Sequence, residues 1–120
     1  MLVGVRDIDN DEFDTIKKYN IKTFTDDHIR MYGIGDVVTQ AMHYLDPKKE
    51  SPFHISLDID GIDPEFAQQT GTRFRYGPSD AETLHVVRRV AHERKLVSMD
   101  LVEINEDLFQ HEKIRLQYRG

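Results

Sequence analysis

The sequence predicts an α/β fold in which a parallel β-sheet is flanked by helices. Two observations predict it. Apolar segments with strand periodicity alternate along the chain with amphipathic helical segments, and that order is typical of parallel sheets covered by helices. The 120 residues, of which 38% are apolar and 32% charged, also suffice for one domain with a modest core.

The composition excludes several classes of protein. A net charge of −6 and the lack of a basic block argue against a nucleic-acid binder. No apolar run is long enough to span a bilayer and no signal-peptide pattern follows Met1, so we expect no membrane partner. The chain has no cysteine, which is compatible with a cytoplasmic location and restricts any metal to oxygen or imidazole ligands.

The first half of the chain predicts one strand, a brief extended piece and three helical segments. Residues 2–9 have the pattern of a short buried strand that ends in charge. Thr25 is a plausible N-cap, and glycines break the helix that follows it. The expected elements are a strand at 2–9, helix 12–19, an extended piece at 21–24, a helical turn after Thr25 that is broken at Gly33 and Gly35, and helix 36–45 ended by Asp46 and Pro47.

The second half predicts two strands with a loop and a helix between them. Residues 53–60 alternate apolar and polar side chains, which is the period of a strand. After a loop that runs to Pro78, Ser79 and Glu82 match a capping box at the start of a helix. That helix carries an apolar stripe of Leu84, Val87, Val90 and Ala91, and residues 95–104 predict the last strand.

Acidic side chains follow each of the three predicted strands. The carboxyl ends of parallel strands meet at one edge of a sheet, where ligands collect. Asp58 and Asp60 would lie on the same face of their strand, so they could bind one cation or bridge two. Carboxylates this close repel one another, and a cation would remove the repulsion. The acids at these strand ends are Asp7 and Asp9, Asp58 and Asp60, and Glu103.

Structural roles compete with these assignments. We expect Asp63 to cap a following helix, Asp7 to pair with Arg6 or another surface cation, and His54 to be a structural residue of its strand. The pair Arg88-Arg89 is interpreted as a solvated helix face. The spacing of glycine and acids after Asp58 does not fit an EF-hand loop, and no phosphate-binding loop is present.

Three motifs in the chain resemble those of one enzyme family. The run S-L-D-I-D-G-I-D-P-E-F, followed by T-G-T, resembles the metal motif of the ureohydrolases and specifically of the arginases. The opening V-G-V-R-D-I-D and the segment M-D-L-V-E-I-N are similar to other strands of that family. The resemblance covers residues 1–107, which would be the C-terminal part of an arginase domain, and leaves residues 108–120 as a divergent tail.

The resemblance implies a three-layer arginase-type fold and a site for two Mn²⁺ ions. It implies hydrolysis of the guanidinium group of L-arginine to urea and L-ornithine, and a homo-oligomer in the complete protein. Water activation by a metal pair would supply the nucleophile at neutral pH. Position by position, it makes Asp58 and Asp60 metal ligands and assigns substrate contacts to Asp9, Glu12, Thr72 and Glu103.

The resemblance also implies what this chain does not contain. The family's other metal ligands and its proton-shuttling histidine belong to upstream motifs, so we expect no catalytic residue within the chain and poor activity of the chain alone. Arg73 replaces a proline of the motif and Ala81 replaces an arginine that joins subunits, while Asn10 and Asp11 replace a Pro-Gly pair.

Three hypotheses about function follow. The leading hypothesis is the C-terminal part of a manganese-dependent arginase-like hydrolase, cut short. The second is a non-catalytic arginase-like paralogue that binds or regulates an active homologue, which Arg73 and the altered loop favour. The third is a small parallel α/β binding domain in which the acids only cap helices.

Overall fold

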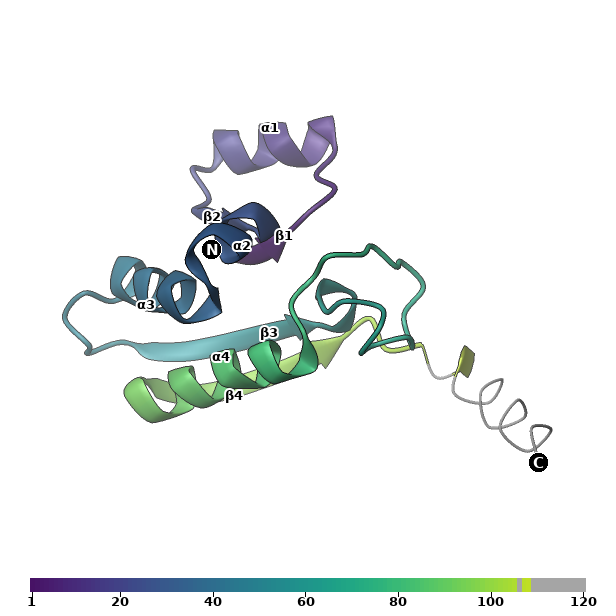
Figure 1. Cartoon of the computed structure of the whole chain (residues 1–120). Coiled ribbons are helices and arrows are strands. Elements are labelled where there is room, and N and C mark those ends of the chain that lie inside the picture. The colour runs from purple at the N-terminus through teal and green to yellow at the C-terminus, as the bar shows by residue number, and fades with distance from the viewer. Residues whose placement is uncertain (106, 109–120) are drawn as a thin grey trace, which may run out of the picture.

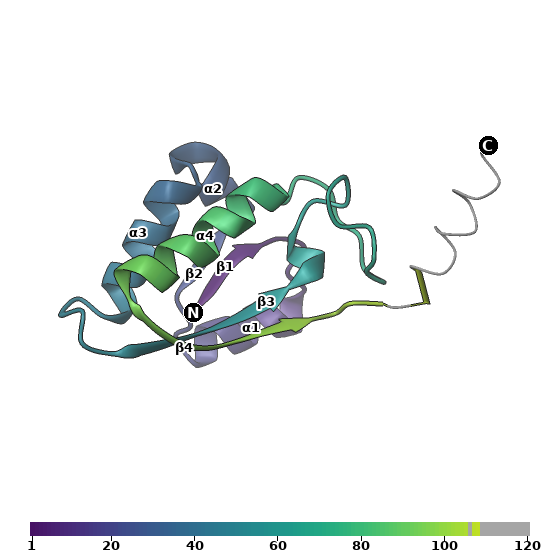
Figure 2. The ribbon, with the colours of Figure 1, turned by 90° about the horizontal axis from the view of Figure 1, so that it is seen from below.

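The computed structural model describes residues 1–105 and 107–108 as three layers of helix, strand and helix. Figure 2 shows α2, α3 and α4 on one side of the strands and α1 on the other. The predicted α/β class with parallel strands is therefore confirmed. In chain order the elements are β1 (Leu2–Val5), α1 (Asn10–Lys18), β2 (Thr23–Thr25), α2 (Asp26–Tyr32), α3 (Ile34–Leu45), β3 (Pro52–Asp58), the 3-10 turn η1 (Ile59–Gly61), α4 (Asp80–Glu93) and β4 (Lys95–Val102) (Figure 1).

The strands within the described residues form two separate parallel pairs, whereas the sequence predicted one sheet. β1 pairs with β2, and β3 pairs with β4. The first pair is short, its register shifts between Val3 and Val5, and Gly4 between them has a φ of +77°. The irregular backbone there limits the ladder to a few residues. The predicted buried strand at 2–9 thus ends at Val5, and its side chains Leu2 and Val3 are partly exposed.

Helix α3 joins the two strand pairs because it contributes to both apolar clusters. On one side, Val37 and Ala41 pack with Phe24 of β2 and Ile29 of α2. On the other side, consecutive positions of the same helix carry the side chains that cover β3. This second cluster consists of Val38 and Met42 of α3, Phe53 of β3 and Val90 of α4. A helix with so broad an apolar stripe suits a position between two surfaces.

The boundaries of the helices follow local side-chain chemistry. The predicted capping box at the start of α4 is confirmed: Glu82 N–H donates to Ser79 Oγ over 3.2 Å, and Ser79 N–H donates to Glu82 Oε2 over 2.9 Å. Thr25 precedes α2 as expected. Gly33, with a φ of +78°, separates α2 from α3, but Gly35 lies inside α3 and breaks nothing, in contrast to our prediction.

Helix α4 differs from the sequence interpretation on both of its faces. Of the predicted apolar stripe, Val90 is buried whereas Leu84 is 47% exposed. Arg89 is not simply solvated: its guanidinium donates to Gly35 O over 3.0 Å and to Thr39 Oγ1 over 2.9 Å, which ties α4 to α3. The same side chain forms an ion pair with Glu93 one turn later. Across the described residues, no helix has the length and apolar character needed to cross a membrane.

Candidate metal and substrate site

Two acids of the predicted site lie side by side because β3 and β4 end together. The parallel register places Asp58, the last residue of β3, opposite Val102, the last residue of β4. Glu103 follows directly, in a left-handed conformation with a φ of 62°. The carboxyl ends of parallel strands therefore bring Asp58 and Glu103 to one edge, as the sequence predicted.

Asp60 reaches this edge by a different route from the one predicted. We expected strand alternation to place Asp58 and Asp60 on one face, but the strand ends at Asp58 and Asp60 lies in η1. Asp58 Oδ1 accepts the backbone N–H of Asp60 over 3.1 Å, so the first acid caps the turn that carries the second. Gly61, the last residue of η1, does not have a left-handed backbone conformation.

The electrostatics of Asp60 agree with a cluster of carboxylates. Burial raises the pKa of Asp60 above its ordinary value, and a hydrogen bond with the Asp58 side chain and the charges of Asp58 and Glu103 raise it further. Arg6 opposes this rise. Crowded carboxylates of this kind hold a proton or attract a cation. Among the residues that the structure describes, however, no three His, Asp or Glu side chains form a complete metal site.

An open pocket lies next to Glu103 and involves part of the predicted substrate region. Its lining comes from the segment after β4 and from the long loop between η1 and α4. These two segments are joined by a hydrogen bond from Asn105 N–H to Gln69 O over 2.8 Å. Thr72, a predicted substrate contact, follows the lining residue Gly71 and is exposed. The lining residues are Gly71, Glu103, Ile104, Asn105 and Asp107.

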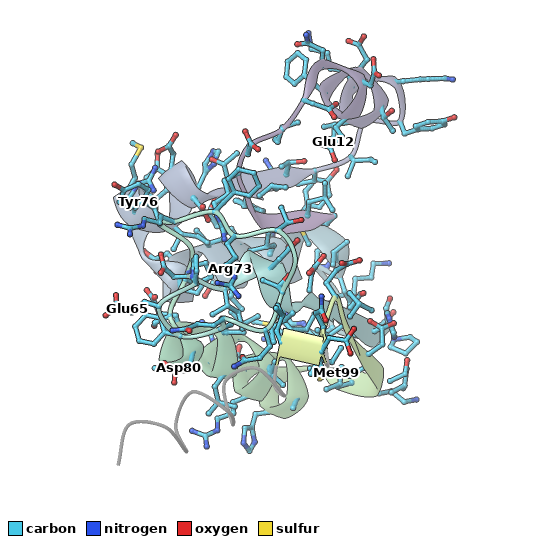
Figure 3. All side chains as sticks on the ribbon, turned by 90° about the vertical axis from the view of Figure 1, so that its right-hand side faces the viewer. Glu12, Glu65, Arg73, Tyr76, Asp80 and Met99 are labelled. Atoms are coloured by element: carbon cyan, nitrogen blue, oxygen red, sulfur yellow. The ribbon has the colours of Figure 1, made fainter. Side chains whose placement is uncertain are left out.

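Asp9 and Glu12 lie together but not with the other acids. Glu12 N–H donates to Asp9 Oδ1 over 2.8 Å, and Asp9 N–H donates to Glu12 Oε2 over 3.2 Å. They form the capping box of α1, and Figure 3 shows Glu12 on that helix, away from the loop that carries Arg73. Asp9 and Glu12 have the same spacing as Ser79 and Glu82, so the sequence alone indicates this second capping box, which we did not predict.

His54 has the structural role that we expected, whereas among the described residues Asp7 does not have the expected ion pair. The ring of His54 has Nδ1 at 2.8 Å from Ser98 Oγ and Nε2 at 3.3 Å from Asp100 Oδ2. Asp7 was expected to pair with Arg6 or another surface cation, but the guanidinium of Arg6 forms its ion pair with Asp26 over 3.5 Å. Asp7 is exposed, with a φ of 52°.

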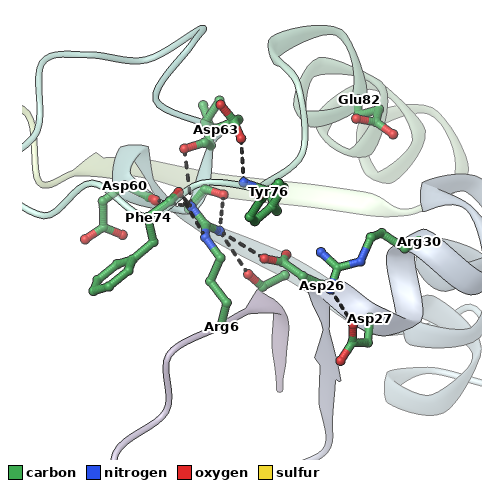
Figure 4. A network of polar contacts seen from close by, with 12 residues as sticks. Arg6, Asp26, Asp27, Arg30, Asp60, Asp63, Phe74, Tyr76 and Glu82 are labelled. Atoms are coloured by element: carbon green, nitrogen blue, oxygen red, sulfur yellow. Dashed lines mark hydrogen bonds and ion pairs between the residues drawn. The ribbon is translucent and has the colours of Figure 1, made fainter.

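Asp63 caps a turn and closes the long loop, whereas we expected it to cap a helix. Its Oδ1 accepts Glu65 N–H over 2.9 Å, and its Oδ2 accepts Tyr76 N–H over 2.6 Å (Figure 4). No helix follows it: residues 64–66 form a turn. The hydrogen bond from Glu65, together with those from Tyr76 and Gly77, lowers the pKa of Asp63.

A pH dependence of stability follows from Asp63. Because its folded pKa lies below the ordinary value of 3.8, the ionised side chain stabilises the fold above about pH 4, and this contribution is lost as the pH falls through the folded pKa. We expect Asp63→Asn to lower the melting temperature near neutral pH and to leave it nearly unchanged at the acid end. Thermal unfolding of both proteins between about pH 2 and pH 7 checks this, and a difference independent of pH would contradict it.

The sequence of this chain is similar to those of known arginases. The model of the arginase family matches residues 1–115. The arginase of Glaciozyma antarctica is 41% identical to this chain over 106 residues, which cover 88% of this chain and 31% of the relative. The chain thus spans about a third of the length of the curated relatives it matches.

Solved arginases have the same arrangement of strands and helices. The arginase of Bacillus caldovelox superposes with a TM-score of 0.81 at 30% identity, over 89% of this chain and 36% of the other. The arginase of Entamoeba histolytica, solved in complex with L-ornithine, superposes with a TM-score of 0.78 at 34% identity, over 88% and 36%. By its sequence motifs, its fold and the family match over nearly all of its length, this chain belongs to the arginase family.

Proposed function

We propose that this chain provides one part of the active site of a manganese-dependent arginase, a hydrolase that converts L-arginine to urea and L-ornithine. The observation that carries the proposal is the meeting of Asp58, Asp60 and Glu103 where β3 and β4 end. Membership of the arginase family supports it, as does the L-ornithine bound to the related arginase of Entamoeba histolytica.

The carboxylates of Asp58 and Asp60 have the chemistry of manganese ligands. Both offer oxygen donors, which Mn²⁺ accepts readily. Burial raises the pKa of Asp60, and so do the Asp58 side chain and the charge of Glu103; a bound cation would offset the repulsion among these carboxylates. Two carboxylates are fewer ligands than a pair of such ions takes. The proposal therefore assigns the other ligands to the upstream motifs of the family, which these 120 residues do not include.

The other acids would act on the substrate. When bound, the metal pair lowers the pKa of water and supplies a nucleophile at neutral pH. Glu103 would hold the cationic guanidinium group by charge and hydrogen bonds, next to the pocket that it lines. Asp9 and Glu12 would attract the α-amino group, and Thr72 would line the pocket. A homo-oligomer and a cytoplasmic location are parts of the same proposal.

A second candidate is a non-catalytic paralogue that binds or regulates an active arginase. Two observations favour it. The guanidinium of Arg73, which replaces a proline of the family motif, donates to Thr70 O over 3.3 Å and also bonds Gln68 O, so it braces its own loop. The carboxylate of Glu12 is already engaged by the backbone N–H of Asp9. Both features alter the region that would contact the substrate in an active arginase, and this favours a protein that does not catalyse the reaction.

A chimeric enzyme tests the proposal. The 106 residues of this chain that match the Glaciozyma antarctica arginase would replace the corresponding third of that relative, so that the upstream motifs come from the relative. We expect the purified chimera to release urea from L-arginine when MnCl₂ is added. A chimera that melts cooperatively and binds Mn²⁺ but releases no urea would overturn the enzymatic proposal and favour the paralogue. Co-elution of the unmodified chain with the intact relative would then test the regulatory role.

A further inference from the structure

Arg6 links segments of the chain that lie far apart in the sequence. Its side chain is only 14% exposed and extends from the residue after β1 toward the end of β3. Nη2 donates to Asp60 O over 2.8 Å, and Nη1 donates to Gly61 O over 2.8 Å. Nη2 and Nε also donate to Phe74 O, over 2.9 and 3.2 Å (Figure 4). One side chain thus fixes both η1 and the returning loop.

These contacts suit the planar guanidinium of arginine and no other side chain. Its donors lie in a fixed plane, so several carbonyls can be held at once in one geometry. Because Arg6 bonds the backbone carbonyl of Asp60, the carboxylate of that residue stays available to a cation. Arg6 therefore fixes the backbone position of Asp60 without forming a hydrogen bond to its carboxylate.

The surroundings of Arg6 leave it little freedom to move. A Cβ atom added at Gly77 would lie 2.9 Å from Arg6 Nη1 and 2.8 Å from both Asp63 N and Gly61 O. The loop backbone therefore packs directly against the guanidinium, and only glycine allows that approach. Arg6 can extend to these carbonyls because residue 77 has no β-carbon.

Asp26 balances the charge of Arg6 from the other side. Its side chain is 6% exposed, and Oδ2 lies 3.5 Å from Arg6 Nη1. In the described part of the chain, the oxygens of Asp26 accept no hydrogen bond of good geometry, and the buried carboxylate is balanced by the charge of Arg6 and, from further away, by that of Arg30. A buried charge with few hydrogen bonds is costly, and here it lies beside the guanidinium of Arg6, which holds η1.

We propose that Arg6, with Asp26 as its counter-charge, is a positioning residue for the metal ligand Asp60 in the arginase reaction. The proposal rests on the proposed function only for the ligand role of Asp60; the fixing of η1 and of the loop by Arg6 is independent of it. Loss of such an outer partner typically weakens metal binding 10- to 100-fold.

The test compares Arg6→Lys with Arg89→Lys in the 120-residue chain. Lysine keeps the positive charge beside Asp60 but cannot hold several carbonyls. Arg89 is a matched control because it also bridges two elements, through Gly35 O and Thr39 Oγ1, away from the site. The readouts are amide hydrogen exchange at Asp63 and Tyr76, whose N–H groups close the loop, and the MnCl₂ concentration that broadens the NMR signals of residues 58 and 60.

We expect Arg6→Lys to speed exchange at these two amides by about tenfold or more and to raise the MnCl₂ midpoint by about 10- to 100-fold. Arg89→Lys should change neither. Unchanged values in Arg6→Lys would overturn the proposal, and so would faster exchange with an unchanged midpoint, because Arg6 would then be structural only. If the unsubstituted chain shows no broadening at residues 58 and 60, its two carboxylates are too few ligands to hold Mn²⁺ alone, and the midpoint is measured in the chimera, where the same rise of about 10- to 100-fold is expected for Arg6→Lys. An unchanged midpoint in the chimera would overturn the proposal.

A measurement on the unsubstituted chain covers the case in which Arg6→Lys does not fold. Held in place, the Arg6 guanidinium should give separate, slowly exchanging Nη proton signals in cold solution, with nuclear Overhauser effects to the α-protons of Gly77. A single averaged signal without those contacts would overturn the proposal.

Discussion

Replacing both Asp58 and Asp60 with asparagine should abolish urea formation in the chimera described above. Asparagine keeps the side-chain oxygen that accepts the N–H of Asp60, so η1 retains its cap, but the two negative charges that would attract Mn²⁺ are lost. Since loss of an outer partner alone costs about 10- to 100-fold, loss of two direct ligands should reduce turnover by more than about 100-fold. A urea assay at saturating MnCl₂ measures the effect.

Glu65→Gln is a suitable control for this prediction. It also removes a negative charge from the same stretch of chain, but its side chain is exposed on the turn after Asp63. We expect its turnover to match that of the unsubstituted chimera. If the double asparagine variant retained full turnover, Asp58 and Asp60 would not be metal ligands.

Phe53→Ala should lower the stability of the chain more than any other single truncation in β3. Phe53 is 8% exposed and packs between α3 and α4 against Val38, Met42 and Val90. Removing a buried phenylalanine ring costs about 3–5 kcal/mol. Small domains have about 5–15 kcal/mol in total, so the variant should lose much or all of its cooperative transition. Unfolding in guanidinium chloride, followed by circular dichroism, measures the change.

Phe13→Ala provides the comparison with the same change of side chain. Phe13 is 48% exposed on α1 and contacts Lys17, whose Nζ lies 4.4 Å from the ring centroid. A contact of this kind at an exposed position is worth about 0.5–1 kcal/mol. We expect a loss no larger than that, and equal losses in the two variants would contradict the assignment of the core.

Periodicity in the sequence was sufficient to predict where strands and helices form, but not where the backbone turns out of them. The alternation that identified β3 placed Phe53 inward and His54 outward correctly. It failed at Asp60, because a carboxylate two residues earlier accepts the Asp60 N–H and turns the backbone into η1. A local side-chain hydrogen bond of this kind competes with the continuation of a strand. Both acids still reach the same edge, although by a turn and not by alternation.

The contacts of Arg6 could not be predicted from local pattern. Its partners are backbone carbonyls of residues 60, 61 and 74, and a backbone carbonyl carries no signature of its own in the sequence. The ion pair with Asp26 likewise depends on the placement of α2 against β1 and not on spacing along the chain. The role of Asp9 and Glu12 in the cap of α1 was different, since their separation alone indicates a capping box.

The pairing of β3 with β4 has a consequence for the order of folding. Pro52 lies opposite Lys95 and Asp58 opposite Val102, so the ladder forms only after the chain has closed a long loop that includes α4. Ladders between distant segments form slowly, because the entropy of closing the loop is lost before the contacts are gained. Until then Asp58 and Glu103 are not neighbours. The acidic edge therefore arises late in folding, and repulsion among its carboxylates opposes a step that a bound cation would favour.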